Sequence, residues 1–308
     1  MLGSLCVVIA STVLPLPFQD AGGAGHAPPH APPEHPPAIT LEPRSGSGVL
    51  RIRSPLLPDE TLDLVACESL LDGTKDFGLY PLKLEPKDWK VENGRCAWTW
   101  PFKEGFRLDF SAAPEKDSVL FQYTLANETK EPLEKVQVFL CLPTMGAPSF
   151  YPGTAEEAKK SPEGRQARVG RSDYTDLFER LHLWSKGKPF SFASTKLGRA
   201  EKRVGYTRKG EELFQWSWFV GGEETFDLPL LAVTSRDGKR SLALGLERAI
   251  WACTNCGDGR ACVHLLPFLG RIGPGATATV KGRIYLVEGG LDDALARFKK
   301  DFPKAARE

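Results

Sequence analysis

The sequence predicts an all-β protein, a large antiparallel two-sheet sandwich with a short C-terminal helix. In many short runs apolar and polar residues alternate, which is the pattern of a strand with one buried face. The chain contains 25 prolines and 30 glycines, and they fall between these runs, where turns are expected. Long helical patterns are nearly absent, and no fixed-period repeat occurs, so propellers and solenoids are excluded.

Length and charge narrow the classes of function. A chain of 308 residues can form one large β domain with a sizeable core. The formal net charge is +1, and acidic and basic residues are interspersed along the chain. Nucleic acid and anionic membranes are therefore not expected as partners, because both select for clustered positive charge.

The N-terminal segment has the features of an export signal. Residues 1–20 include the apolar stretch Leu2 to Phe18, which has the length of a signal peptide, and small residues suited to cleavage follow it. The segment departs from the usual pattern in having no Lys or Arg after Met1. Two prolines interrupt the stretch and it is short for a bilayer span, so we expect a secreted or periplasmic protein with no stable membrane insertion after signal removal.

The next segment has a composition that cannot form a core. Residues 21–38 contain HAPPHAPPEHPP, which favours extended, solvated conformations and predicts a disordered linker. Residues 39–308 are predicted to form a single sandwich domain.

Strand patterns follow one another closely from Ala38 onward. The first group has β-branched and aromatic residues in alternation, with Gly, Pro, Asn or Asp between the runs. A hairpin is expected at 118–143, with Asn127 and Pro132 in its turn. The predicted runs are 38–43, 48–54, 60–67, 80–86, 88–94, 95–102, 106–112 and 118–127.

The second half predicts fewer, longer elements. Residues 146–173 are polar and predict a long loop with a short helix near 155–160. A hairpin over 176–194 that turns at Lys186 to Lys188 and an aromatic strand at 213–220 are expected next. The stretch 241–288 then contains three strand-like runs, of which the first continues from Ser241 to Cys253.

Residues 291–302, LDDALARFKKDF, predict a helix near the end of the chain. Acidic residues occupy its first turn and lysines its last, as the helix dipole favours. Five apolar residues share one face: Leu291, Ala294, Leu295, Phe298 and Phe302.

Two segments carry a resemblance to a known group. FQYTLANETKEPLEKVQVFLCLP and the ending PGATATVKGRIYLVEGGLDDALARF resemble secreted bacterial proteins of the galactose-mutarotase-like β-supersandwich group. The resemblance is one of pattern over most of the chain after residue 40. It implies a two-sheet supersandwich that binds or processes carbohydrate, as an epimerase or as a sandwich domain of a glycoside hydrolase or polysaccharide lyase. The acid/base pair of His and carboxylate that the group uses does not map onto a position here.

The residues themselves suggest a sugar site built from two strands. One strand face is expected to hold Arg180, His182 and Trp184, and the open face of the run 241–253 to hold Glu247 and Trp251. Indole planes stack on sugar rings, and Arg and His bind hydroxyl or carboxylate groups, so Trp184 and Trp251 are the predicted substrate contacts. A solvated sheet face with an amphipathic Trp explains the same pattern without a ligand.

If the protein is catalytic, we expect general acid/base chemistry on a carbohydrate or polysaccharide. His182 or His264 would pair with Glu247 across a groove, and Arg180 would hold a substrate oxygen. This predicts an epimerase, lyase or hydrolase that needs no cofactor. A non-catalytic carbohydrate- or surface-binding module is the alternative.

A group of cysteines near the end of the chain allows two interpretations. Export and the even number of cysteines after Cys6 favour at least one disulfide. The alternative is zinc, because a C-x2-C pair followed by C-x-H supplies four tetrahedral ligands. The zinc ligands would be Cys253, Cys256, Cys262 and His264.

Overall fold

The computed structural model describes most of the chain from Ala38 onward. The predicted signal peptide, the linker up to residue 37, most of the predicted loop 146–173, the strand at 213–218 and Cys256 lie outside the described residues. The described ranges are 38–73, 75–79, 82–84, 88–150, 174–194, 203–212, 219–255 and 261–306.

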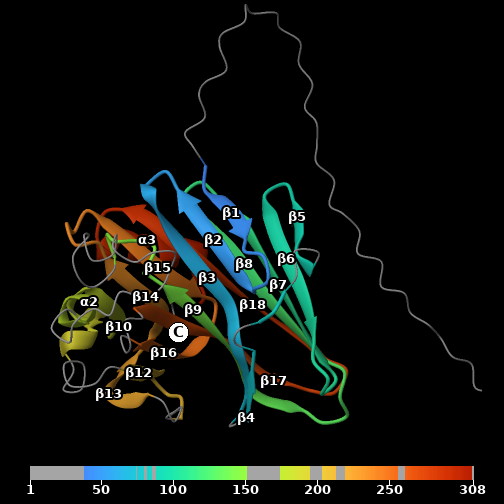
Figure 1. Ribbon diagram of the computed structural model, residues 1–308. Helices are drawn as coiled ribbons and strands as arrows, with labels where there is room; N and C mark the ends of the chain where they lie inside the picture. Colours follow the sequence, from blue (N-terminus) through green and yellow to red (C-terminus); the bar gives the residue numbers. More distant parts are fainter. Residues whose placement is uncertain are drawn as a thin grey trace, which may run out of the picture. The chain divides into compact units, whose positions relative to one another are not determined.

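The strands form two nine-stranded sheets (Figure 1). The first sheet has the order β1-β2-β3-β9-β17-β16-β12-β13, and β4 pairs with β3 outside this path. Its strands are β1 (Thr40–Pro43), β2 (Val49–Ser54), β3 (Leu57–Asp72), β4 (Lys75–Gly78), β9 (Leu133–Pro143), β12 (Arg203–Arg208), β13 (Val220–Phe226), β16 (Ala249–Asn255) and β17 (Cys262–Ile272).

The second sheet has the order β11-β10-β14-β15-β18-β8-β7-β6-β5. Neighbouring strands in both sheets are antiparallel except β12 and β13, which pair in parallel. The strands of the second sheet are β5 (Lys90–Glu92), β6 (Arg95–Pro101), β7 (Phe106–Pro114), β8 (Ser118–Asn127), β10 (Leu181–Ser185), β11 (Lys188–Ser191), β14 (Leu228–Thr234), β15 (Arg240–Leu246) and β18 (Thr277–Glu288).

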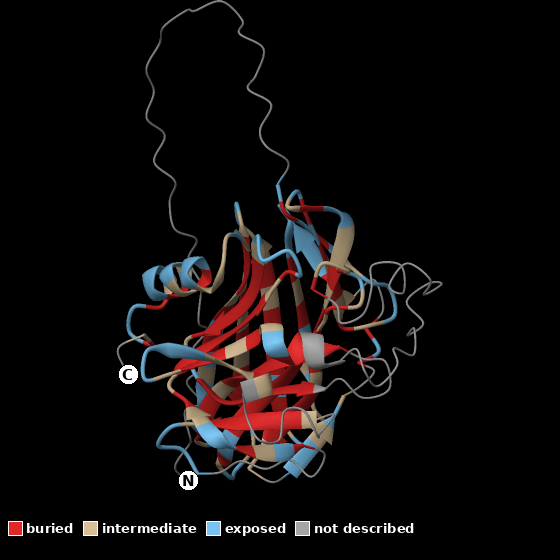
Figure 2. Ribbon diagram, turned by 90° about the vertical axis from the view of Figure 1, so that its left-hand side faces the viewer, coloured by how far each residue is buried: buried red, intermediate tan, exposed pale blue. Residues whose placement is uncertain are grey.

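One large hydrophobic core lies between the sheets. It takes alternate residues from many of the strands, for example Leu140 and Leu142 from β9 and Leu242, Leu244 and Leu246 from β15. These residues belong to the core because successive side chains in a strand point to opposite faces. Figure 2 shows the buried residues running along the strands, with exposed residues at the turns. The predicted two-sheet sandwich is confirmed.

The C-terminal helix covers part of the outer face of the second sheet. Helix α3 (Leu291–Asp301) begins and ends within one residue of the predicted helix. Its residues Ala294 and Phe298 pack against Trp184, Ala243 and Tyr285 of the sheet. A second hydrophobic cluster therefore stabilises this face, and only the remaining side of the helix is free to contact water.

Two shorter elements differ from the predicted hairpin at 176–194. Its first part is helical, α2 (Tyr174–Arg180), and it ends in a 3-10 helix, η3 (Phe192–Ser194). The middle is the predicted hairpin of β10 and β11, in which Ser185 pairs with Lys188. Lys186 and Gly187 both have positive φ, of 53° and 73°, as a two-residue hairpin turn with a right-handed strand twist requires.

Two other segments that the sequence predicts as continuous are divided between the sheets. The predicted hairpin at 118–143 is wrong, because β8 pairs in the second sheet and β9 in the first. The run 241–253 is likewise two strands, β15 in the second sheet and β16 in the first, joined by Glu247 and Arg248. In each case the chain crosses the core and the alternation continues on the other side.

The helices among the described residues are short: α2 has 7 residues and α3 has 11. None of the helices there combines the length and the apolar character that a bilayer crossing requires.

Gly282 on β18 offers a test of the packing between the sheets. A Cβ atom at this position would lie 2.3 Å from Phe121 Cζ and 2.5 Å from Leu246 Cδ2, both in the core. We expect Gly282→Ala to lower the free energy of unfolding by about 1–3 kcal/mol through overpacking. Urea denaturation measures the loss. Gly273→Ala, which has open space around it, is the control and should change stability little.

Candidate functional site

The outer face of the first sheet brings three metal-ligating side chains together. Cys141 lies on β9, and Cys262 and His264 lie on the neighbouring strand β17. Their ligand atoms lie within 4.8 Å of one another, and all three residues are buried. We call this group the thiol–imidazole cluster.

Strand register explains the position of the cluster. Cys262 pairs with Pro143 and Val263 with Leu142, so His264 lies opposite Cys141 while Cys262 is its diagonal neighbour. The intervening Val263 and Leu265 belong to the core. Because side chains alternate, the cluster residues must point to the other face.

The His264 ring is held by one hydrogen bond and two aromatic neighbours. Its Nδ1 lies 2.9 Å from the Leu140 carbonyl oxygen, which can only accept, so Nδ1 carries the proton. Its Nε2 is buried and makes no hydrogen bond of regular geometry. The ring lies 4.7 Å from that of Phe139 and 6.4 Å from that of Phe219.

The two thiols and the imidazole shift one another's pKa values. Contact with the Cys141 thiol, opposed by burial and helped by His264, lowers the pKa of Cys262 to about 6. Burial raises the pKa of Cys141 well above its usual value. Burial acts to lower the pKa of His264, but the neighbouring Cys262 sulfur outweighs it and raises that pKa. Cys262 is therefore the thiol that most readily becomes a thiolate.

Glu68 is the carboxylate that acts on this cluster. It interacts with the Cys141 thiol, and it adds a smaller effect to the burial that raises the pKa of Cys253. The register of β3 against β9 shifts between Val65 and Ser69, at the position of Glu68. Such irregularities redirect side chains, and here one accounts for a half-buried acid beside buried thiols.

The predicted zinc ligands are only partly brought together. Cys262 and His264 are neighbours as expected, but Cys141 from a distant strand completes the group in place of Cys253. Cys253 lies opposite His264 on β16, on the other side from Cys141. Cys256 is outside the described residues.

The preferred disulfide is not seen in the described part of the chain. The cysteines there are all free and buried: Cys67, Cys96, Cys141, Cys253 and Cys262. Cys6 and Cys256 are outside these residues.

His182 and Glu247 do not share a groove. His182 on β10 pairs with Ala232 on β14, which pairs with Ala243 on β15. Glu247 lies four positions further along the chain than Ala243, just past the end of β15. At 3.3 Å per residue and 4.8 Å per strand the two Cα atoms are roughly 16 Å apart. Tyr285 and Phe298 fill the space beside Gly245 on this face.

The other predicted catalytic residues are also dispersed. His264 lies on the outer face of the first sheet and Glu247 at the end of a strand of the second, with the core between them. Glu247 accepts a hydrogen bond of 2.9 Å from the Lys281 backbone N–H. Arg180 donates to the Thr234 carbonyl oxygen at 2.6 Å. The structure thus separates the predicted catalytic residues, and their roles stay predictions.

The predicted stacking residues present no surface to a sugar. Trp184 is 1% exposed beneath α3, and Trp251 is 0% exposed. The Trp251 indole lies over Gly205, where a Cβ atom would come within 2.1 Å of it. Contact with a ligand stays a prediction for both.

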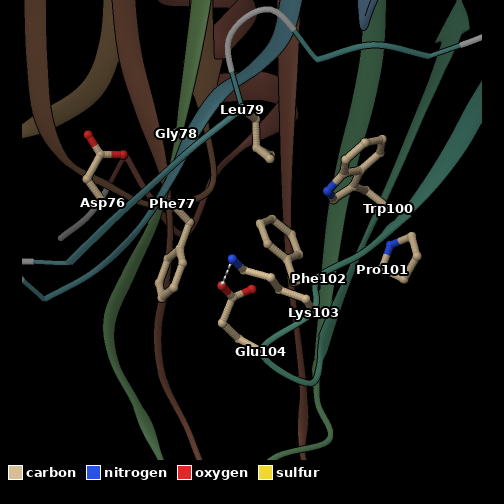
Figure 3. Close-up of a pocket in the computed structure, with 9 residues that line it drawn as sticks. All are labelled: Asp76, Phe77, Gly78, Leu79, Trp100, Pro101, Phe102, Lys103 and Glu104. Atoms are coloured by element: carbon tan, nitrogen blue, oxygen red, sulfur yellow. Dashed lines mark ion pairs between the residues drawn. The ribbon is translucent and has the colours of Figure 1, made fainter.

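A different aromatic group lines an open pocket of about 460 Å³. Figure 3 shows Phe77 of β4 and Trp100 of β6 on opposite sides, with Phe102 between them. Phe77 and Phe102 are edge to face, with centroids 6.3 Å apart. The polar residues are Asp76, whose carboxylate accepts a hydrogen bond from the Ser69 hydroxyl, and Lys103 and Glu104, which form an ion pair at 3.9 Å.

Sequence reasoning missed Cys141, Glu68 and this pocket. Alternation alone places the Cys141 side chain on the opposite face of the strand from Leu140 and Leu142. The pairing of β9 with β17 cannot be read from the sequence, because His264 and Leu140 are 124 residues apart in the chain. Trp100 lies two positions after Trp98, and for aromatic residues that share a strand face in this way a core position is the better interpretation. Trp98 follows that interpretation, at 2% exposed, whereas Trp100 is only partly buried against the core.

Solved structures of similar architecture include carbohydrate-related proteins. A galactose mutarotase-like protein from Clostridium acetobutylicum has 9% identity and a TM-score of 0.42, covering 81% of this chain and 98% of that one. A galactose mutarotase related enzyme from Lactobacillus acidophilus has 7% identity and a TM-score of 0.39, covering 82% and 98%. An alpha-N-acetylgalactosaminidase from Bifidobacterium bifidum has 10% identity and a TM-score of 0.46, covering 86% and 37%.

Proteins of the group that the sequence resembles are thus among these similar structures. At such low identity and TM-scores the matches assign no activity. No protein-family model matches the sequence. No curated protein matches it either.

The titration of His182 tests the placement of this residue. Burial lowers its pKa, against a smaller opposing effect of its Nδ1 contact with the Arg180 carbonyl oxygen. We expect its ring signals in NMR to titrate below the usual range of histidine. The unfolded chain then binds the proton more tightly, so this residue should reduce stability as pH falls through that range. His182→Gln assigns the signal, and a pKa at or above the usual value would contradict the placement.

Proposed function

We propose that this protein is a carbohydrate-binding β-sandwich protein that holds a neutral sugar in the aromatic pocket beside β4 and the end of β6. The observation that carries the proposal is the set of three half-buried aromatic residues, Phe77, Trp100 and Phe102, around one open cavity. Ligand pockets commonly combine apolar and aromatic walls with a few placed polar groups.

The aromatic walls suit the apolar faces of a sugar ring. Trp100 and Phe102 are half-buried, so each exposes part of a ring while its other contacts hold it against the core. Phe102 is also packed against Phe106, with centroids 4.4 Å apart. Rings fixed in this way lose little conformational freedom when a ligand stacks on them.

The polar groups of the pocket favour a neutral ligand. The carboxylates of Asp76 and Glu104 can accept hydrogen bonds from sugar hydroxyls, while Lys103 offers the one ammonium group among the lining residues. Two carboxylates beside one cation repel the carboxylate of a uronic acid. Arg180, which was predicted to hold a substrate oxygen, donates to the Thr234 backbone carbonyl oxygen.

The binding interpretation has better support than the catalytic one. Acid/base catalysis needs a base and an acid within hydrogen-bond reach of the same substrate. His182, Glu247 and His264 occupy three separate surroundings, as described above. We therefore favour a module that binds sugar without turnover.

Export is the second part of the proposal, and it rests on the sequence of residues 1–20 alone. In a bacterial host with a functioning export pathway, we expect the full chain to leave the cytoplasm and to lose about its first 20 residues. Mass spectrometry of the N-terminus of the exported product checks this. Val8→Arg should keep the chain inside the cell, whereas export of an uncleaved chain or retention of the original one would contradict the proposal.

Trp100→Ala tests the pocket directly. We expect it to lower the affinity for neutral oligosaccharides by roughly tenfold or more, about 1.4 kcal/mol, because the ligand loses a stacking surface. Isothermal titration calorimetry against matched neutral and uronic-acid oligosaccharides measures the change, and a product assay on the same samples detects turnover.

Thr99→Ala is the matched control for this experiment. Thr99 is the preceding residue of β6, points to the other face and hydrogen-bonds Asp109 at 2.6 Å. It should leave affinity unchanged. Stronger binding of the uronic acids would contradict the proposed ligand class. Equal binding by both variants would contradict the pocket. Turnover of a sugar would contradict the absence of catalysis.

A further inference from the structure

We propose that Cys141, Cys262 and His264 bind a zinc ion on the outer face of the first sheet. This site is independent of the proposed sugar pocket. The described residues contain these three ligand atoms within 4.8 Å of one another, all on two adjacent strands.

The distances suit a tetrahedral ion. Zinc bonds of about 2.3 Å to sulfur and 2.0 Å to nitrogen place two ligand atoms roughly 3.5–3.8 Å apart. Ligand atoms within 4.8 Å can reach this separation by small side-chain rotations. The strands themselves need not move, because β9 and β17 already hold His264 opposite Cys141.

His264 is oriented as a ligand. The Leu140 carbonyl oxygen occupies Nδ1, so the lone pair lies on Nε2, and Nε2 is the buried atom that makes no regular hydrogen bond. A backbone carbonyl on the far nitrogen is a common outer partner of a metal-bound histidine. A buried polar atom without a regular hydrogen bond is costly, and a metal ion shared with Cys262 would satisfy it.

The surroundings of the cluster favour a closed site. Val49 and Val65 pack against the two cysteines, and Phe139 and Phe219 flank the imidazole. Two thiolates and an imidazole are soft or intermediate ligands that select against Mg²⁺ and Ca²⁺. On binding, each thiol passes its proton to solvent, and the two thiolates balance the charge of the ion.

Three ligands are assigned in this proposal, and Glu68 lies near them but outside the group of atoms that are within 4.8 Å of one another. Its side chain is half-buried and interacts with the Cys141 thiol. Carboxylate oxygen is a common zinc ligand alongside sulfur and nitrogen. The register shift of β3 between Val65 and Ser69, a segment that contains Glu68, can turn this side chain toward the thiols.

Cys141 and Cys253 provide a matched pair of variants. The two residues lie opposite His264 on the strands at either side of β17, and both are buried thiols. Cys141→Ser removes a ligand of the proposed site, whereas Cys253→Ser removes a ligand of the set predicted from sequence. A general effect of a buried Cys→Ser change would affect them equally.

The experiment measures metal content and cobalt absorption of the full chain, purified under reducing conditions and dialysed against zinc or cobalt. We expect one zinc per chain and a thiolate-to-cobalt charge-transfer band. Cys141→Ser and Cys262→Ser should each lose more than roughly 100-fold in zinc affinity, beyond the roughly 10- to 100-fold effect of an outer partner. Cys253→Ser should keep both the zinc and the band, and circular dichroism confirms that each variant is folded.

Three results would overturn the proposal. The first is free thiols at Cys141 and Cys262 with no bound metal in the original chain. The second is a disulfide between them, found by mass spectrometry of unreduced peptides. The third is loss of zinc in folded Cys253→Ser with retention in Cys141→Ser, which would restore the ligand set predicted from sequence. Sugar binding is measured separately and does not depend on any of these results.

Discussion

The packing of inward-facing side chains between the two sheets determines what the outward faces can carry. On β9 and β17 the core takes Leu140, Leu142, Val263 and Leu265. A slip of one residue would turn these side chains to the outside and remove their burial, so the register is strongly specified. The thiol–imidazole cluster thus depends on residues that never touch it.

The sequence predicted the strands and the closing helix well because these elements depend on local pattern. Alternation identified β1, β2, β3, β6, β7 and β8, and the 3.6-residue period identified α3. It failed where the chain changes sheets, at the turn after Asn127 and at Glu247 and Arg248. Where the chain passes from one sheet to the other, apolar and polar residues continue to alternate. The alternation therefore does not indicate to which sheet each strand belongs.

The prediction of the candidate site failed for the same reason, because alternation does not show which sheet a strand joins. Glu247 and Trp251 were placed on one face because they are four positions apart, yet Glu247 follows the last residue of β15 in the second sheet and Trp251 lies on β16 in the first. Aromatic residues add a second difficulty, because an indole is equally suited to a core and to a sugar. Only the neighbours decide: α3 covers Trp184, whereas Trp100 lies near the end of β6, beside a pocket.

The free thiols and the proposed export place a constraint on each other. In an oxidising compartment a pair such as Cys141 and Cys262 would be expected to form a disulfide. Burial slows that reaction at Cys141 by raising its pKa and keeping the thiol protonated, but Cys262, whose pKa is lowered to about 6, gains no such protection. A bound metal ion would engage both sulfurs and remove the nucleophilic thiolate. A metal ion bound by both sulfurs is therefore compatible with export, and a disulfide between them is the outcome that export without a metal predicts.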